Sequence, residues 1–151
     1  MESYTRVIIG LGSNLGDKET NLYKAVAHLS FLRNVKQSDI YASKALLPPN
    51  APKEWYIDFL NMAVSGDVNL SPIDLLNTVQ SIEIAMGRPK DHLKWSPRII
   101  DIDILIYGTY SFNIPELIIP HPGLFKRDFA FNPSKEIEPE LLQEVYNRYN
   151  I

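Results

Sequence analysis

The stretch that decides the fold is Trp95–Gly108, with the sequence WSPRIIDIDILIYG. Its part Ile99–Tyr107 is rich in β-branched residues, which predicts a strand. Alternate residues of a strand point to the same face, so Asp101 and Asp103 are expected to share one face with Cα atoms about 7 Å apart. The opposite face is predicted to be an apolar core stripe of Ile100, Ile102, Ile104 and Ile106.

Outward from this strand, strand-like and helix-like patterns alternate. Further strands are expected at 7–11, 35–43 and 56–68. Helices are expected at 21–32 after an N-cap at Asp17, at 72–86 after an N-cap at Ser71, briefly around Leu124, and at 138–149. The order predicts an α+β, ferredoxin-like βαββαβ core, with a mainly antiparallel sheet and helices on one face. Two long loops, 46–54 and 88–97, interrupt it.

Composition limits the class of protein. The 151 residues suit a single domain, 1–151. A net charge of -3 argues against general nucleic-acid binding. The chain has no cysteine, which excludes disulfides, thiolate metal sites and cysteine nucleophiles. No apolar run approaches the ~20 residues that span a bilayer, and no signal-peptide pattern is present. A cytosolic protein without a membrane partner is expected.

The two aspartates are the first candidate site. Ionised side chains in an apolar strand are costly to desolvate unless they are paired. Mg²⁺ would pair them, because it prefers carboxylate and water oxygens and often binds through carboxylates together with substrate phosphates. The alternative is that Asp101 and Asp103 lie on a solvated face of the sheet, and the D-x-D pattern by itself leaves both interpretations open.

Cations surround this pair in the sequence. Phosphoryl transfer needs metal ions on the phosphates and cations on the developing charge. Arginine can grip a phosphate bidentately, and lysine acts as a point charge. Taken alone, Lys90 or Lys94 would be part of a solvated loop. Beside the aspartates, a polyphosphate site is favoured, with candidates Arg88, Lys90, His92, Lys94, Arg98, His121, Lys126 and Arg127.

Several other residues allow a structural and a functional interpretation. Trp95, Phe59 and Phe129 would by default pack on the core, but each could stack on a flat heteroaromatic ring. Asn61 could sit on an exposed face, or pair its amide with the edge of a pterin or purine. On the helix 72–86, Gln80 and Glu83 are either exposed helix residues or side chains that face the site.

The glycines do not indicate a common nucleotide-binding fold. Gly10, Gly12 and Gly16 give G-x-G-x-x-x-G rather than the dinucleotide fingerprint, and no Walker A pattern is present. Two classes of protein remain as alternatives. One is a Mg²⁺-dependent nucleotide-using transferase or phosphohydrolase with a D-x-D site, and the other is a non-catalytic nucleic-acid module. The second needs exposed aromatic residues and a basic surface.

In this order, the motifs IGLGSNLGD, FLNMAV, IEIAMGRP, WSPRIIDIDILIYG and IPHPGLFKRDFAF resemble the 6-hydroxymethyl-7,8-dihydropterin pyrophosphokinase family of folate biosynthesis. The resemblance runs from about Val7 to Leu141. It implies a ferredoxin-like core, two Mg²⁺ ions, and transfer of pyrophosphate from ATP to the pterin hydroxymethyl group with AMP as product.

The resemblance also implies residue roles. Asp101 and Asp103 match the Mg²⁺ ligands, and with Arg88, Lys94 and Arg98 they form the expected catalytic set. The expected ATP-side residues are Gln80, Glu83, Arg88, Lys94, Trp95, Arg98, Ile104, His121 and Arg127. The expected pterin-side residues are Ser43, Leu46, Phe59, Asn61, Trp95, Asp101 and Phe129.

Lys90, Lys94, Phe59 and the segment 132–135 depart from the family pattern. Lys90 and Lys94 stand where arginine is common, which removes the bidentate fork. Phe59 stands where tyrosine is common, which removes a hydroxyl group.

Members of the family are sometimes fused to another folate enzyme, so the chain could be one half of a bifunctional protein. The two long loops are expected to close over ATP and exclude water.

Overall fold

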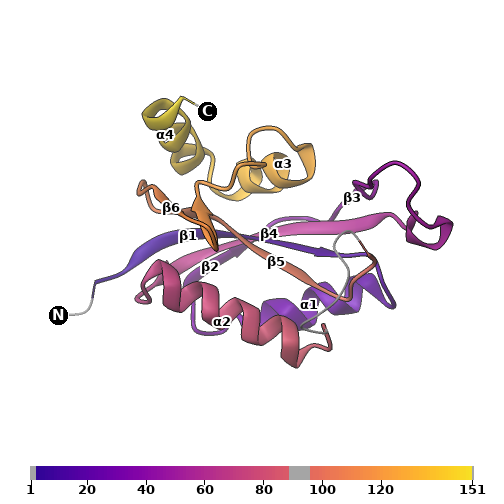
Figure 1. The fold of residues 1–151 in the computed structure, drawn as a ribbon. Coiled ribbons are helices and arrows are strands. Elements are labelled where there is room, and N and C mark those ends of the chain that lie inside the picture. Colours follow the sequence, from indigo (N-terminus) through magenta and orange to yellow (C-terminus); the bar gives the residue numbers. More distant parts are fainter. Residues whose placement is uncertain (1–2, 89–95, 151) are drawn as a thin grey trace.

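The computed structural model describes residues 3–88 and 96–150. Its centre is an antiparallel sheet in the order β2-β4-β1-β5 (Figure 1). These strands are β1 (Thr5–Ser13), β2 (Arg33–Gln37), β4 (Phe59–Val68) and β5 (Asp101–Tyr107), and a short β3 (Tyr41–Ser43) pairs with the start of β4. With one helix between β1 and β2 and another between β4 and β5, this topology confirms the predicted ferredoxin-like core.

One face of the sheet is covered by α1 (Lys18–His28) and α2 (Pro72–Ala85), the two helices of the βαββαβ repeat. The Asp17 side chain caps α1 by accepting from Thr20 N–H at 3.2 Å, and the Ser71 side chain caps α2 in the same way with Asp74 N–H. The core on this side contains Ile9, Leu22, Val64, Leu75, Val79, Ile100, Ile102 and Ile104.

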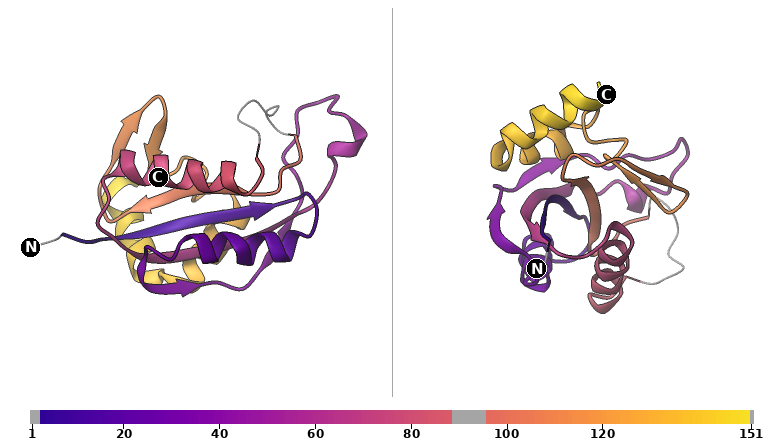
Figure 2. Two further views of the ribbon diagram at one scale, coloured as in Figure 1. Left: turned by 90° about the horizontal axis from the view of Figure 1, so that it is seen from below. Right: turned by 90° about the vertical axis from the view of Figure 1, so that its left-hand side faces the viewer.

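The opposite face is also covered, which corrects the expectation of helices on one face only (Figure 2). There α3 (Asp128–Ile137) and α4 (Pro139–Tyr149) pack on a second core that includes Ile8, Ala63, Leu124 and Val145. The helix expected around Leu124 is a turn, and the helix begins at Asp128 instead. Pro133 lies inside α3, where proline removes a backbone donor, so the sequence pattern hid this helix.

A bulge in β5 changes the predicted stripe of isoleucines. Ile9 pairs with Ile104, but the next residue back, Ile8, pairs with Ile106, so Leu105 is an extra residue. Ile100, Ile102 and Ile104 share one face as expected, whereas Ile106 joins the core under α3 and α4. The prediction for Ile106 was therefore wrong, because the period of two fails at a bulge.

The remaining elements are short. The strand expected at 35–43 is divided into β2 and β3, which pair with different parts of β4. A 3-10 turn, η1 (Lys53–Trp55), lies in the loop that follows β3. The strands β6 (Phe112–Ile114) and β7 (Leu117–Ile119) form a separate hairpin. Within residues 3–88 and 96–150, no helix has the length and apolar character needed to cross a bilayer.

Candidate active site

A hollow in the sheet forms the floor of the site. In the strand register, Gly12 lies between Asp101 of β5 and Asn61 of β4, and Gly10 lies between Asp103 and Ala63. Because glycine has no side chain, the middle strand leaves open space between the carboxylates and the Asn61 amide. A Cβ atom at Gly12 would lie 3.3 Å from Asn61 Oδ1 and would narrow this space.

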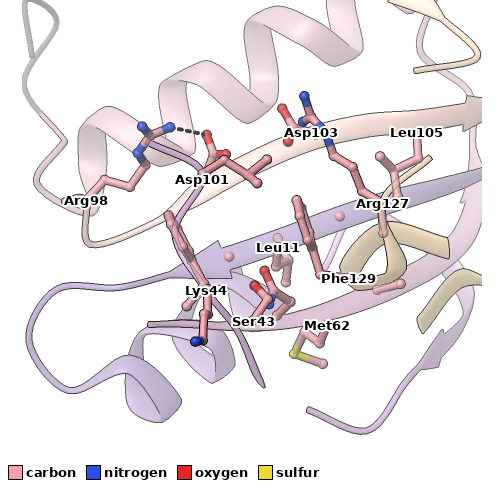
Figure 3. Close-up of a pocket in the computed structure, with 17 residues that line it drawn as sticks. Leu11, Ser43, Lys44, Met62, Arg98, Asp101, Asp103, Leu105, Arg127 and Phe129 are labelled. Atoms are coloured by element: carbon pink, nitrogen blue, oxygen red, sulfur yellow. Dashed lines mark hydrogen bonds and ion pairs between the residues drawn. The ribbon is translucent and has the colours of Figure 1, made fainter. Parts of the chain in front are cut away.

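The walls of the pocket come from two segments that are distant in the sequence (Figure 3). Arg127, Phe129 and Ala130 enter from the start of α3, and the loop after β3 contributes another side. The carboxylates and Arg98 line one part of the pocket and aromatic and amide groups line another, so the pocket is chemically divided. The remaining lining residues include Leu11, Ser43, Lys44, Leu46, Phe59, Asn61, Met62 and Leu105.

Glu83 connects α2 with the edge strand β5. One oxygen, Oε2, accepts from Ile102 N–H at 2.8 Å and from Arg88 Nη1 at 2.5 Å. The same Arg88 nitrogen donates to Asp101 Oδ1 at 2.9 Å, and Arg98 Nη1 lies 3.5 Å from that oxygen. Glu83 and Asp101 therefore share Arg88, and Asp103 follows Asp101 two residues later on β5.

Burial raises the pKa values of two carboxylates in this cluster. Burial raises the pKa of Glu83 to about 7, and the bonds from Ile102 and Arg88 only partly oppose the effect. Burial also raises the pKa of Asp103 well above its usual value, and the Asp101 and Glu83 charges add to it. Both carboxylates would be stabilised as anions by a further positive charge, and carboxylate oxygens suit a hard divalent cation.

The amide of Asn61 organises the other side of the pocket. Asn61 is 5% exposed, and its Nδ2 donates to Tyr41 O at 3.1 Å and Ser43 Oγ at 2.8 Å. Outside the pocket, Glu136 of α3 accepts from Tyr41 O–H at 2.5 Å and from Asp39 N–H at 2.9 Å. These bonds hold β3 against β4 and against α3, which carries the Phe129 wall.

His121 lies beside the site rather than in the pocket lining. Its main-chain N–H donates to Leu105 O at 2.9 Å, and its Nδ1 accepts from Gly123 N–H at 3.0 Å. Burial and the nearby Arg127 charge lower its pKa. The imidazole is therefore neutral at pH 7, with the ring proton on Nε2 as a donor.

The structure brings together most of the residues singled out in the sequence. Arg98, Asp101, Asp103, Arg127, Ser43, Leu46, Phe59, Asn61 and Phe129 line the pocket, and Glu83 and Arg88 contact it through Asp101. Gln80 is exposed on α2, and the Ile104 side chain is buried in the core on the opposite face of β5. Lys90, His92, Lys94 and Trp95 lie outside the described residues.

Among the polar side chains near the site, Lys44 and Asn14 were not predicted as site residues. Lys44 lines the pocket from the loop after β3. Asn14, which directly follows β1, is 1% exposed and hydrogen-bonds Arg98 and Ile57. An uncharged polar residue directly after a buried strand was the signal available for Asn14, but its partners are distant in the sequence.

Comparisons with known proteins identify the family. The chain is 40% identical over 143 residues to a 2-amino-4-hydroxy-6-hydroxymethyldihydropteridine pyrophosphokinase of Aquifex aeolicus, covering 94% of this chain and 86% of the relative. It is 41% identical over 136 residues to a folate synthesis bifunctional protein of Chlamydia trachomatis, covering 87% of this chain and 30% of the relative. The chain thus spans about a third of the length of the chlamydial proteins.

The fold is shared with a solved structure. The crystal structure of Plasmodium falciparum HPPK-DHPS wild type with SDX-DHP aligns with a TM-score of 0.69 at 14% identity, covering all of this chain and 47% of that one. The model of the 7,8-dihydro-6-hydroxymethylpterin-pyrophosphokinase family matches residues 8–139. That match takes in both aspartates, the glycine hollow and the start of α3, and the chain belongs to this family.

Proposed function

We propose that the protein transfers the pyrophosphoryl group of ATP to the hydroxymethyl oxygen of 6-hydroxymethyl-7,8-dihydropterin in folate biosynthesis. The observation that carries this proposal is the divided pocket. Asp101, Asp103 and Arg98 line one part, and the Asn61 amide lies across the hollow at Gly12. A phosphate chain and a flat, polar-edged ring fit these two parts.

The carboxylate pair is the proposed Mg²⁺ site. Asp101 and Asp103 are acceptor-only oxygen ligands on one face of β5, and burial together with the Asp101 and Glu83 charges raises the pKa of Asp103. We expect them to hold two Mg²⁺ ions together with ATP phosphates. When bound, the metal supplies charge neutralisation and orientation of the phosphate oxygens.

The protein groups have separate roles in the proposed reaction. The pterin oxygen forms a bond to the β-phosphorus, and the bond from that phosphorus to the α–β bridging oxygen breaks, which releases AMP. Arg98 and Arg127 stabilise negative charge on the phosphates. Arg88 is held between Glu83 and Asp101, so it fixes the position of that carboxylate.

The ring-binding side fits a pterin by its hydrogen-bonding capacity and shape. Asn61 offers its amide oxygen towards the hollow, since its Nδ2 is engaged by Tyr41 and Ser43. Phe59 and Phe129 line the same pocket and offer apolar faces against which a ring could stack. Trp95 is expected to contribute as well, and the roles of Lys94, Gln80 and Ile104 remain predictions from the resemblance.

We further propose that residues 1–151 act as one pyrophosphokinase domain, because both cores are built on the same sheet. Some relatives are named folate synthesis bifunctional proteins, so a fused or neighbouring folate enzyme is the proposed partner.

Product analysis tests the activity. The protein is mixed with Mg²⁺, ATP and 6-hydroxymethyl-7,8-dihydropterin, and nucleotides and pterins are separated by chromatography. One AMP formed for each pterin diphosphate supports the proposal. Formation of ADP would point to simple phosphoryl transfer, and nucleotide turnover that ignores the pterin would favour another D-x-D enzyme.

A further inference from the structure

Asn14 connects two segments that flank the site. It follows β1 directly, and its side chain accepts one hydrogen bond and donates another. Its Oδ1 accepts from Arg98 N–H at 2.8 Å, and its Nδ2 donates to Ile57 O at 3.2 Å. Its own main-chain N–H donates to Arg98 O at 3.1 Å, so Arg98 is held at both of its main-chain polar groups.

Each partner of Asn14 leads to a different part of the pocket. Arg98 lines the phosphate side, and its guanidinium lies 3.5 Å from Asp101. Ile57 comes two residues before Phe59, which lines the pocket beside Gly12. The end of β1, the loop after β3 and the start of β5 all lie at one end of the molecule (Figures 1 and 2). The buried Asn14 amide therefore contacts both the main chain of Arg98, on the phosphate side, and the segment that leads to Phe59, on the ring side.

We propose that Asn14 is a positioning residue for the transfer reaction. It sets the spacing between the Arg98 main chain and the Ile57–Phe59 segment, and through them the distance between the ATP and pterin sides. This inference rests on the proposed function. Transfer between two bound substrates depends on their mutual geometry, and a misplacement of about 1 Å can lower the rate roughly 100-fold.

The chemistry of the side chain explains why an asparagine stands here. An amide presents one acceptor and one donor group at the end of a short, stiff side chain. At 1% exposure, losing either partner leaves a buried polar group unsatisfied. Aspartate keeps the acceptor for Arg98 N–H but, when ionised, cannot donate to Ile57 O. Alanine removes both bonds.

A matched control is Asn21 of α1, whose side chain contacts the end of β1 and the turn that follows it. Its Nδ2 donates to Ser13 Oγ, at the end of β1, at 3.3 Å and to Leu15 O, in the turn that follows, at 2.9 Å. Asn21→Ala thus removes amide hydrogen bonds from this region without removing the bonds to Arg98 and Ile57.

The test compares Asn14→Ala, Asn14→Asp and Asn21→Ala with the wild-type protein. Steady-state kinetics with Mg²⁺, ATP and the pterin are measured at pH 8, together with melting temperature and hydrogen exchange at the Arg98 amide.

We expect Asn14→Ala to lower kcat by about 100-fold, as a misplacement of the reacting groups does, and to speed hydrogen exchange at the Arg98 amide. We expect Asn14→Asp to keep the Arg98 amide protected and to raise the pterin KM about 10-fold, as the loss of one hydrogen bond does. Asn21→Ala should keep kcat within about twofold, since it leaves the transfer geometry intact.

Several results would overturn the inference. Folded Asn14→Ala with wild-type kinetics would do so, as would equal kinetic losses in Asn21→Ala. If Asn14→Ala does not fold, an unchanged pterin KM in Asn14→Asp decides against the proposal, and failure of both variants to fold would assign Asn14 to the fold itself. Absence of turnover in the wild type would instead refute the proposed function, and Arg98 exchange would still report whether Asn14 holds that segment.

Discussion

Two polar clusters lie at opposite ends of the central sheet and differ in how their charges are balanced. At the start of β1, Arg6 pairs with Glu138 at 2.8 Å and with Asp67 at 3.3 Å. Ser65 Oγ donates to Glu138 at 2.6 Å, and Asn34 Nδ2 donates to Asp67 at 2.9 Å. In this cluster each carboxylate accepts hydrogen bonds from an arginine and from a neutral donor.

At the other end of β1, burial penalises the ionised carboxylates of Glu83 and Asp103 in the site cluster. Hydrogen bonds from Asn34 and Arg6 lower the pKa of Asp67, whereas burial raises the pKa of Glu83 and Asp103. The first cluster favours its ionised state and stabilises the fold. In the second cluster, burial disfavours the ionised carboxylates, and a bound cation would stabilise them. Perturbed pKa values of this kind are common at functional sites. The comparison predicts that the two clusters respond oppositely to mutation.

The largest effect is expected at the site. Asp103→Asn should lower kcat by roughly 1000-fold, because it removes a carboxylate that orients and neutralises the phosphate chain. The melting temperature without Mg²⁺ should stay the same or rise, since the variant removes a buried charge. Kinetics and thermal unfolding of the same preparation check both parts. A melting temperature that falls as far as kcat does would mean that Asp103 is structural.

Arg6→Ala should show the reverse pattern. Removing the arginine leaves Glu138 and Asp67 without their cation, and we expect a loss of about 2–4 kcal/mol in the free energy of unfolding. The kcat of the folded fraction should stay near the wild-type value, because the cluster lies at the opposite end of β1 from Gly12. Urea unfolding and kinetics at low temperature measure the two quantities. A large loss of kcat with unchanged stability would break the comparison.

The pH dependence of stability should differ in sign between the clusters. Glu83 has a raised pKa, so the unfolded chain releases its proton first as pH rises. The contribution of Glu83 to the free energy of unfolding should therefore fall by up to about 3 kcal/mol between pH 4.5 and 7. Asp67 has a lowered pKa, so its contribution is present above its unfolded pKa and is lost as pH falls through the folded one.

Urea unfolding without Mg²⁺ at a series of pH values measures this difference. Glu83→Gln should flatten the decline towards pH 7, and Asp67→Asn should flatten the loss at low pH. If Glu83→Gln leaves the profile unchanged, Glu83 ionises normally in the folded protein.

The smallest effect is expected beside the pocket, where β3 meets α3. Tyr41→Phe removes the hydrogen bond to Glu136, which should cost about 1 kcal/mol of stability. The pterin KM should rise only a few-fold, since Asn61 still donates to Tyr41 O and Ser43 Oγ. An unchanged kcat with this modest change in KM would show that the Tyr41–Glu136 hydrogen bond affects only the shape of the pocket. A loss of kcat would contradict that role.

Local patterns in the sequence predicted the ferredoxin-like core and the shared face of Asp101 and Asp103, because strand and helix periods are local properties. Ile106 and α3 were missed where a local rule fails, at the Leu105 bulge and at Pro133. The contacts of Asn14 and Glu83 depend on residues far away in the chain. Sequence alone could propose that Glu83 faces the site, but not that it caps Ile102 N–H and holds Arg88.

The most direct test of pyrophosphoryl transfer is to follow the phosphorus atoms of ATP. The protein is given Mg²⁺, the pterin and ATP labelled separately at the β- and γ-phosphorus, and the label in the pterin product is counted. We predict that both labels move together into the pterin and that unlabelled AMP remains. Transfer of the γ-label alone, with the β-label left in ADP, would contradict the central claim.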